Sequence, residues 1–291
     1  MPLLGAHMSI AGGYARAVEA AARCGMDVVQ LFTKNNNQWR AKAISEQEAA
    51  DFHERLLTLG ITRPLSHSSY LLNLASPDGT LRDKSIAACV VELQRAEQLG
   101  IRHVVLHPGA HMGSGEEAGI ANIVGSLQTV LVQSHGLACG ILLETTAGQG
   151  SSLGHRFEHL AAILDATAAP GRLGVCLDTC HLFAAGYPLQ SRRDYLRTIR
   201  ELDERIGCER VLAIHLNDSK REMGSRVDRH EHIGRGKLGL EPFRHFLNDR
   251  RFRDVPMYLE TAKGLEGGED LDVINLRTLR GLIQPTRRRR V

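Results

Sequence analysis

The sequence contains no run of about 18 apolar residues, the length that a membrane-spanning helix requires. A transmembrane segment is therefore excluded. The chain also contains no C-x-x-C pair, and its six cysteines are scattered. Scattered cysteines are typical of reduced thiols and exclude a disulfide scaffold. The amino terminus has no charged segment ahead of an apolar stretch, so we expect a cytoplasmic protein without a secretory signal.

Aromatic residues are scarce, and neither sign of charge predominates. Aromatic residues make up 4% of the 291 residues, and 36 Lys and Arg nearly balance 33 Asp and Glu, for a formal net charge of +3. This charge is compatible with nucleic-acid binding but does not require it. Apolar residues at 43% and charged residues at 24% are typical of a folded chain and exclude disorder.

Short apolar runs alternate with longer helical patterns along the chain, as in a repeated βα unit. Nearly continuous apolar runs are typical of parallel strands that are buried on both faces. Eight such runs occur, at residues 3–7, 28–32, 64–67, 103–107, 141–144, 173–178, 211–215 and 257–260.

The segments between these runs carry helix start and stop signals. Ser45 and Glu48 have the spacing of a capping box, and Gly60 is placed to end that helix. Pro242 suits the first turn of a helix. Glycines are also placed to end four other helices, at Gly25, Gly100, Gly136 and Gly207.

Eight strands and eight helices predict a (β/α)₈ TIM barrel as a single domain over residues 1–284. An open doubly wound sheet is the alternative, but no G-x-G-x-x-G follows the first strand. The pattern from Glu266 onward is less regular, and residues 285–291 form a basic tail that includes Arg287 to Arg290. We interpret the tail as a solvated charge run, with contact to nucleic acid as the alternative.

Polar residues occupy the ends of the predicted strands, where the active site of a TIM barrel lies. Burying so many carboxylates costs several kcal/mol each unless cations compensate. Mixed histidine and carboxylate ligands suit Zn²⁺ or Mn²⁺, and nine ligands exceed the three or four that one zinc ion takes. The sequence therefore predicts a multinuclear metal site formed by His67, His107, Glu144, Asp178, His181, His215, Asp228, His230 and Glu260.

Two cysteines near His181 suggest a thiolate zinc site as an alternative. On an extended strand, Cys176 shares the inward face with Asp178, so we expect it to pack inside the barrel. A minor ligand role for Cys180 stays open.

Phosphate-ester hydrolysis is the reaction that best explains several metals, because paired cations activate the water and stabilise the leaving oxygen together. Such reactions need barrier reductions of around 20 kcal/mol, whereas one general acid or base supplies roughly 3–5 kcal/mol.

The loops after the strands indicate a substrate with a phosphate backbone. Lys34 to Arg40 follow the second strand, and four cations follow the seventh: Lys220, Arg221, Arg226 and Arg229. Tyr70 and Leu71 lie on a predicted exposed loop and could form a wedge between bases. The alternative is that both pack beneath that loop.

Seven motifs occur at the ends of the predicted strands and in the loops that follow them. They are Gly5-Ala6-His7-Met8-Ser9 through Gly12-Gly13, Leu31-Phe32-Thr33-Lys34-Asn35, Leu106-His107-Pro108-Gly109, Glu144-Thr145-Thr146-Ala147-Gly148-Gln149-Gly150, Asp178-Thr179-Cys180-His181, His215-Leu216-Asn217-Asp218 and Gly224-Ser225-Arg226-Val227-Asp228-Arg229-His230. With these motifs the chain resembles, from about residue 3 to Glu260, the endonuclease IV family of metal-dependent apurinic/apyrimidinic endonucleases.

The resemblance implies a TIM barrel with three zinc ions, Mn²⁺ being an alternative at one position. It implies hydrolysis of the phosphodiester 5′ to an abasic site in duplex DNA, which leaves a 3′-hydroxyl and a 5′-deoxyribose phosphate, and removal of 3′-blocking groups. All nine predicted ligands match family ligands. Glu144 resembles a bridging ligand, and Glu260 one that orients or deprotonates the attacking water.

The resemblance also implies a monomer that contacts DNA through Lys34, Asn37, Tyr70, Leu71, Asn217, Lys220, Arg226 and Arg229. Family members carry an arginine that penetrates the DNA stack where this chain has Asn37. We expect hydrolysis to persist with weaker contact to the DNA duplex opposite the lesion, because flipping a nucleotide out of the duplex costs less at a damaged site.

A metal-dependent sugar isomerase or epimerase is the rival interpretation, since such enzymes share the barrel and a mouth of histidines and carboxylates. They typically need one or two metals and a small closed pocket, whereas the Asp228-Arg229-His230 element and the basic loops favour DNA. A DNA-binding protein without activity would leave the ligand set unexplained.

Overall fold

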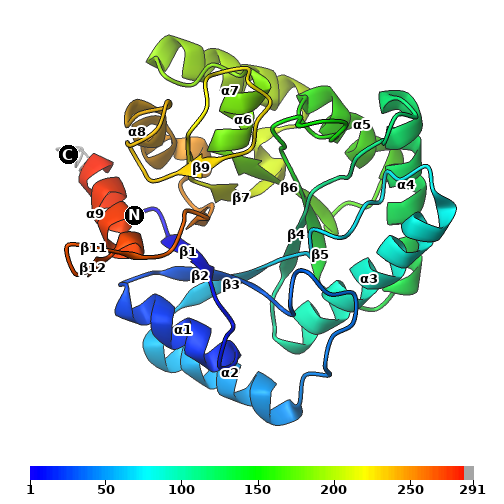
Figure 1. Cartoon of the computed structure of the whole chain (residues 1–291), viewed down its shortest axis with the longest axis horizontal. Helices are drawn as coiled ribbons and strands as arrows, with labels where there is room; N and C mark the ends of the chain where they lie inside the picture. Colours follow the sequence, from blue (N-terminus) through cyan, green and yellow to red (C-terminus); the bar gives the residue numbers. More distant parts are fainter. Residues whose placement is uncertain (285–291) are drawn as a thin grey trace, which may run out of the picture.

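The computed structural model describes residues 1–284, in which eight parallel strands close into a barrel (Figure 1). Around the ring the order is β1-β10-β7-β6-β5-β4-β3-β2, so consecutive barrel strands are neighbours and the open-sheet alternative is excluded. The strands are β1 (Leu4–Met8), β2 (Val28–Phe32), β3 (Thr62–His67), β4 (His103–Leu106), β5 (Gly140–Glu144), β6 (Leu173–Asp178), β7 (Val211–His215) and β10 (Met257–Leu259).

All eight predicted strands are confirmed; three have the predicted ends, and the ends of the others differ by at most two residues. Two of the differences concern predicted ligands. β10 ends before Glu260 because the Glu260 amide donates to the side-chain oxygen of Asn217 at 2.8 Å instead of to a neighbouring strand. β4 ends before His107, which precedes Pro108, a residue without an N–H for the ladder.

Helices surround the barrel on its outside (Figure 1). The helices of residues 1–284 are α1 (Tyr14–Arg23), α2 (Glu46–Leu59), α3 (Gly79–Gln98), α4 (Glu116–Gln133), α5 (Phe157–Thr167), α6 (Thr179–Ala185), α7 (Arg192–Arg205), α8 (Glu241–Asn248) and α9 (Leu271–Leu282). Short 3₁₀ turns occupy η1 (Cys208–Arg210) and η2 (Arg250–Phe252), and two-residue strands form the pairs β8 (Asp218–Ser219) with β9 (His230–Glu231) and β11 (Leu265–Glu266) with β12 (Glu269–Asp270).

The predicted helix signals are confirmed. The Ser45 hydroxyl accepts from the Glu48 amide at 3.2 Å, and the Ser45 amide donates to the Glu48 carboxylate at 2.9 Å. Gly60 ends α2 with φ of 67°, a left-handed conformation that costs glycine least. Pro242 lies in the first turn of α8. The other four predicted glycines follow helix ends with positive φ: Gly25, Gly100, Gly136 and Gly207.

Two expectations about helices were wrong. We expected eight, but the described residues contain nine, because α6 begins directly at the end of β6 with the Asp178 side chain as its cap. The chain after Glu266 is also more regular than expected. Asp270 caps α9, which buries leucines and lies beside β1, near the amino terminus (Figure 1). The predicted basic tail, 285–291, lies outside the described residues.

The barrel interior is filled by apolar side chains, which confines the polar chemistry to one end. The inner cluster consists of Val28, Leu65, Val105, Leu142, Cys176, Ala213 and Tyr258. The inward position predicted for Cys176 is thus confirmed, and burial raises the pKa of its thiol to about 12. A larger apolar cluster lies between the strands and the helices.

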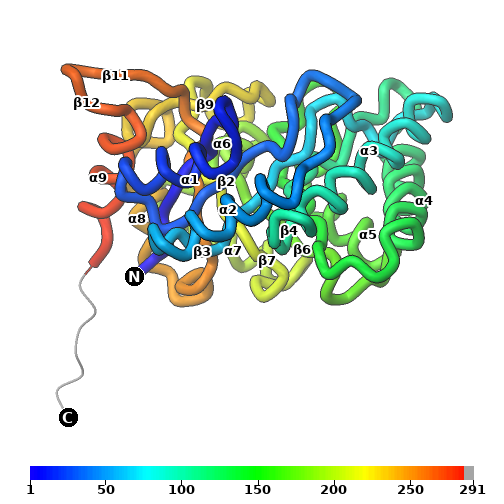
Figure 2. The backbone as a smooth tube through the Cα atoms, turned by 90° about the horizontal axis from the view of Figure 1, so that it is seen from below, coloured from blue at the N-terminus to red at the C-terminus, as the bar shows by residue number. Residues whose placement is uncertain are grey.

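The segments that follow the strands gather at one edge of the molecule. In Figure 2, β9 and the β11–β12 pair lie toward the upper edge, whereas the amino terminus lies toward the lower one. Among residues 1–284, none of the helices has the length and apolar character needed to cross a membrane.

Candidate functional site

The structure brings all nine predicted ligands together at the carboxyl end of the barrel. The ligand atoms of eight of them form three groups, and within each group all these atoms lie within 4.8 Å of one another, whereas Asp228 is grouped with His230 and Cys180. Glu144 belongs to the first and second groups, and Asp178 to the second and third. The groups are His67, His107 and Glu144; Glu144, Asp178, His215 and Glu260; and Asp178, His181 and His230.

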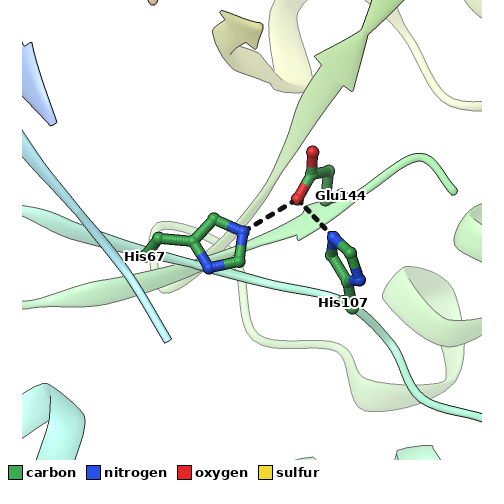
Figure 3. A group of neighbouring side chains, drawn as sticks. All are labelled: His67, His107 and Glu144. Atoms are coloured by element: carbon green, nitrogen blue, oxygen red, sulfur yellow. Dashed lines mark hydrogen bonds and ion pairs between the residues drawn. The ribbon is translucent and has the colours of Figure 1, made fainter. Parts of the chain in front are cut away.

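The first group centres on one oxygen of Glu144, the last residue of β5 (Figure 3). Oε2 of Glu144 lies 3.1 Å from Nε2 of His67 and 3.0 Å from Nε2 of His107. The Nδ1–H of His67 donates to the carbonyl of Ser68 at 2.8 Å, which leaves Nε2 as the ring nitrogen that faces the carboxylate. A ring that donates from one nitrogen and presents the other is typical of a metal ligand.

The second group uses the other oxygen of Glu144. Nδ1 of His215 lies 2.8 Å from Glu144 Oε1 and 3.3 Å from Glu260 Oε2. Asp178 Oδ2 lies 3.9 Å from the same nitrogen. Glu144 therefore reaches two groups with separate oxygens, as a bridging carboxylate does.

The third group lies where α6 begins. The Nδ1–H of His181 donates to the carbonyl of Thr145 at 2.7 Å, and its Nε2 lies 3.1 Å from Asp228. Nε2 of His230 lies 3.2 Å from Asp228 and 3.7 Å from Asp178. Asp228 thus joins this group, and Asp178 links it to the second.

The Sγ of Cys180 lies within 4.8 Å of a carboxylate oxygen of Asp228 and a ring nitrogen of His230. Burial, however, raises the pKa of its thiol to about 12, and its Sγ lies 3.8 Å from the carbonyl of Arg229. A neutral, hydrogen-bonded thiol is a weak ligand, so these contacts favour a structural role.

The charges of the site are arranged as a cation would require. Burial lowers the pKa of His181, but Asp178 and Asp228 raise it well above its usual value. Burial raises the pKa of Glu144, but His215 and His107 lower it well below its usual value. Buried carboxylates and imidazole lone pairs that converge in this way fit divalent cations, which would replace the histidine protons as the compensating charge.

Removal of metal is expected to leave a protein that is more stable at about pH 6 than at about pH 8.5. His181 and His215 have folded-state pKa values raised above 6.5, so their stabilisation is complete below pH 6.5 and is lost as the pH rises through the folded values. The carboxylates Glu144 and Glu260 have lowered pKa values, so their stabilisation is present above pH 4.5 and is lost on acidification. Thermal unfolding of chelator-treated protein checks this; equal midpoints at both pH values would contradict it.

Two buried amides, those of Asn217 and Gln30, hold these ligands, a role that the sequence did not predict for either residue. The amide nitrogen of Asn217 donates to Asp178 at 2.6 Å, and its oxygen accepts the Glu260 N–H. Gln30, on β2, contacts both Glu260 and His215. A glutamine inside an apolar strand was the available signal, because a buried amide needs partners.

Comparisons with known proteins identify the family. A family model described as "Xylose isomerase-like TIM barrel" matches residues 18–277. "Probable endonuclease 4" of Geobacter sulfurreducens is 52% identical over 281 residues, 97% of this chain and 94% of the relative. Its counterpart in Chloroflexus aurantiacus is 50% identical over 284 residues, 98% of this chain and 99% of the relative. The crystal structure of endonuclease IV from Thermus thermophilus superposes with a TM-score of 0.85 at 39% identity, covering 97% of this chain and 98% of that one.

The chain belongs to the endonuclease IV family. Sugar epimerases, the rival interpretation, match far more weakly: a D-psicose 3-epimerase has a TM-score of 0.65 at 15% identity, covering 96% of this chain and 94% of that one. That likeness shows the fold alone. Endonuclease IV enzymes are metal-dependent, which agrees with the three ligand groups.

Two residues expected at the DNA interface of this endonuclease IV family member, Lys34 and Asn217, are buried. The ammonium of Lys34 lies 3.3 Å from Glu92, with side-chain exposures of 3% and 1%, and donates to the Gln38 carbonyl at 2.8 Å. Asn217 is also buried and is fully engaged with the metal ligands. The Lys34 contacts hold the loop after β2 to α3, and the Asn217 contacts hold Asp178 and Glu260, while the role of both residues in DNA binding stays a prediction.

The other expected DNA contacts lie on the loops around the metal centre. Tyr70 is 60% exposed, and its ring centroid lies 5.6 Å from that of His67, whereas Leu71 is half-buried. Four further side chains are exposed: Asn37, Lys220, Arg226 and Arg229.

A second cluster of ligand-type residues, Glu116, His155 and His159, lies outside the metal centre. The Arg156 guanidinium lies within it, donating to Glu116 at 2.8 Å and approaching Nε2 of His159 at 3.0 Å. The amide of Gly154 lies 3.3 Å from Nδ1 of His159, and the Nε–H of Arg156 donates to Nε2 of the same ring, where a metal ion would have to bind. These contacts describe an ion pair with neutral histidines rather than a metal site.

Proposed function

We propose that this endonuclease IV family member, a hydrolase that acts on DNA, cleaves the phosphodiester bond 5′ to abasic sites in duplex DNA. The products would be a 3′-hydroxyl and a 5′-deoxyribose phosphate, and 3′-blocking groups would be removed by the same site. The observation that carries the proposal is the chain of three ligand groups joined by Glu144 and Asp178. The high identity to the endonuclease 4 relatives supports it.

We propose three Zn²⁺, with Mn²⁺ as an alternative at one position, because the donors are mixed imidazoles and carboxylates. His67, His107 and Glu144 would hold the first ion, Glu144, Asp178, His215 and Glu260 the second, and Asp178, His181, Asp228 and His230 the third. Paired divalent cations supply an activated water and stabilise charge on phosphoryl oxygens.

The protein's own side chains would position the reacting atoms. Glu144 and Asp178 keep neighbouring groups close, since each reaches two of them. The Glu260 side chain is 12% exposed, whereas that of Glu144 is fully buried. Glu260 is therefore the ligand carboxylate placed to orient or deprotonate a water, while Glu144 serves as the bridge.

The loops around the metal centre, here called the rim, would bind DNA through exposed cations and through Tyr70 as an aromatic wedge. Lys220, Arg226 and Arg229 lie on the segment that follows β7 and would contact phosphates. A cavity of about 230 Å³ lined by His67, Tyr70 and His107 opens beside the first ligand group and would accept the abasic sugar. Asn37 is exposed and would make only polar contacts, with no penetration of the base stack.

Tyr70→Ala is expected to raise KM for an abasic duplex about tenfold, because stacking of a base on an aromatic ring contributes roughly 1–3 kcal/mol. Binding to undamaged duplex should change little. Steady-state kinetics and fluorescence anisotropy with both duplexes provide the measurement. Within residues 1–284, Tyr70 is the one exposed tyrosine, so Met112→Ala, on the loop after β4 and 57% exposed, serves as the control. Equal KM values for Tyr70→Ala and the wild type would contradict the wedge.

The decisive experiment is incision of an end-labelled duplex that carries one synthetic abasic site, with an undamaged duplex as control. The metal content of the same preparation is determined in parallel. Cleavage 5′ to the lesion by protein that carries about three zinc ions is the expected result. Fully metal-loaded protein that leaves the abasic duplex intact would overturn the proposal and favour sugar epimerisation.

We further propose that the enzyme is a cytoplasmic monomer. All six cysteines, each within residues 1–284, are free thiols, which suits a reducing compartment. Light scattering with a stable dimer mass would overturn the oligomeric part of this proposal.

A further inference from the structure

Gln30 lies at the base of the metal centre, and its side-chain amide contacts two of the ligands. On β2, Gln30 shares the inward face with Val28, which belongs to the inner apolar cluster of the barrel. Its side chain is completely buried and lies between that inner cluster and the ligands Glu260 and His215. Gln30 pairs in register with His7 of β1.

The amide of Gln30 has a single orientation that satisfies its partners. Its nitrogen donates to Oε1 of Glu260 at 2.6 Å and to Nδ1 of His7 at 3.0 Å. Its oxygen lies 2.8 Å from Nε2 of His215. Reversal of the amide would place two oxygens against each other at Glu260, because an ionised carboxylate only accepts. Both N–H groups and the carbonyl are therefore committed.

This orientation determines how both ligands face the cations. Because the Gln30 oxygen accepts from Nε2–H of His215, the other ring nitrogen, Nδ1, is the one that faces Glu144 and would give its lone pair to a cation in the second ligand group. Because Gln30 holds Oε1 of Glu260, Oε2 remains directed at the same group, 3.3 Å from the His215 Nδ1.

We infer that Gln30 is a positioning residue, whose one amide fixes the ring nitrogen that His215 presents and the oxygen that Glu260 presents to the second metal ion. The inference rests on the proposed metal centre. It extends that proposal to a residue that is neither a ligand nor a DNA contact. Hydrogen-bond partners of ligands orient them, and their loss typically costs 10–100-fold in metal affinity or activity.

Gln30→Met tests the inference, because methionine has a similar length and removes all three hydrogen bonds. We expect the affinity for the most weakly held Zn²⁺, measured by competition with a chelator, to fall about 10–100-fold. We expect kcat on abasic duplex to fall with KM nearly unchanged, since Gln30 is buried away from DNA. Gln30→Glu, which still accepts from His215 but repels Glu260, should show a comparable loss of kcat.

Leu31→Met is the matched control, because Leu31 is the adjacent buried residue on the opposite face of β2. It perturbs packing on the same strand and should retain zinc affinity and kcat. Thermal unfolding of the chelator-treated proteins shows whether each variant folds. If Gln30→Met does not fold, Gln30→Glu provides the test. Wild-type zinc affinity and kcat in a folded Gln30 variant would overturn the inference alone. A wild-type chain that binds no zinc would overturn the proposed function and the inference with it.

Discussion

Glu144→Gln is expected to lower incision at an abasic site by at least about 10³-fold, which corresponds to about 4 kcal/mol of barrier. Glu144 is the only ligand of the described residues that belongs to both the first and the second group, and each of its oxygens faces a different group. An amide keeps the shape but supplies only one oxygen and no charge. Neighbouring cations would therefore lose their shared ligand.

Metal analysis and DNA binding separate this effect from unfolding. We expect Glu144→Gln to bind at least one zinc ion fewer than the wild type and to retain its affinity for abasic duplex, because the exposed cations are untouched. Asp249→Asn makes the same chemical change at a carboxylate that contacts Tyr195 and Arg251, outside the metal centre. It should lose stability and keep its zinc and its turnover. Full turnover in Glu144→Gln would refute the bridging role.

The convergence of the nine predicted ligands at one end of the barrel was predictable from the sequence, because two simple rules place these residues. Apolar runs identify the barrel strands, and the residue that closes each run lies at the catalytic end. His67, Glu144 and Asp178 each end a strand in the structure, as these rules require. His181, in contrast, owes its place to α6, a short helix that the pattern did not predict.

The partners of the ligands could not be predicted, because they come from distant parts of the chain. Gln30 and His215 are 185 residues apart in sequence, and nothing in the run around Gln30 indicates which side chain it meets. The burial of Lys34 is a similar case. Its position in a polar loop suggested exposure, but Glu92 of α3 lies beneath that loop and holds the ammonium inside.

Lys34→Met is expected to destabilise the protein by about 3 kcal/mol, because loss of one partner of a buried ion pair leaves the other charge uncompensated. The remaining charge is Glu92, which also accepts from the Thr33 hydroxyl at 2.9 Å and the Ser69 amide at 3.3 Å. Glu92 thus ties the loop after β2 to the loop after β3. Urea unfolding of the metal-loaded protein provides the free energy of unfolding.

The same substitution should weaken DNA binding without changing the metal content, since Lys34 also fixes the loop that carries Asn37 by donating to the Gln38 carbonyl. We expect KM for abasic duplex to rise and kcat to remain close to the wild-type value. The double variant Lys34→Met/Glu92→Gln removes the isolated charge and should recover part of the lost stability. A double variant no more stable than Lys34→Met would contradict the buried-pair explanation.

The salt dependence of DNA binding distinguishes a lysine that holds a loop in place from a lysine that contacts a phosphate directly. A lysine that neutralises one phosphate contributes about one unit to the slope of log K against log salt, so its removal lowers the slope by about one. Because Lys34 is buried and paired with Glu92, its removal should weaken binding with an unchanged slope. Arg229→Met, at an exposed cation of the rim, is the control that should lower the slope. A lower slope in Lys34→Met would mean that the ammonium leaves Glu92 for DNA in the complex.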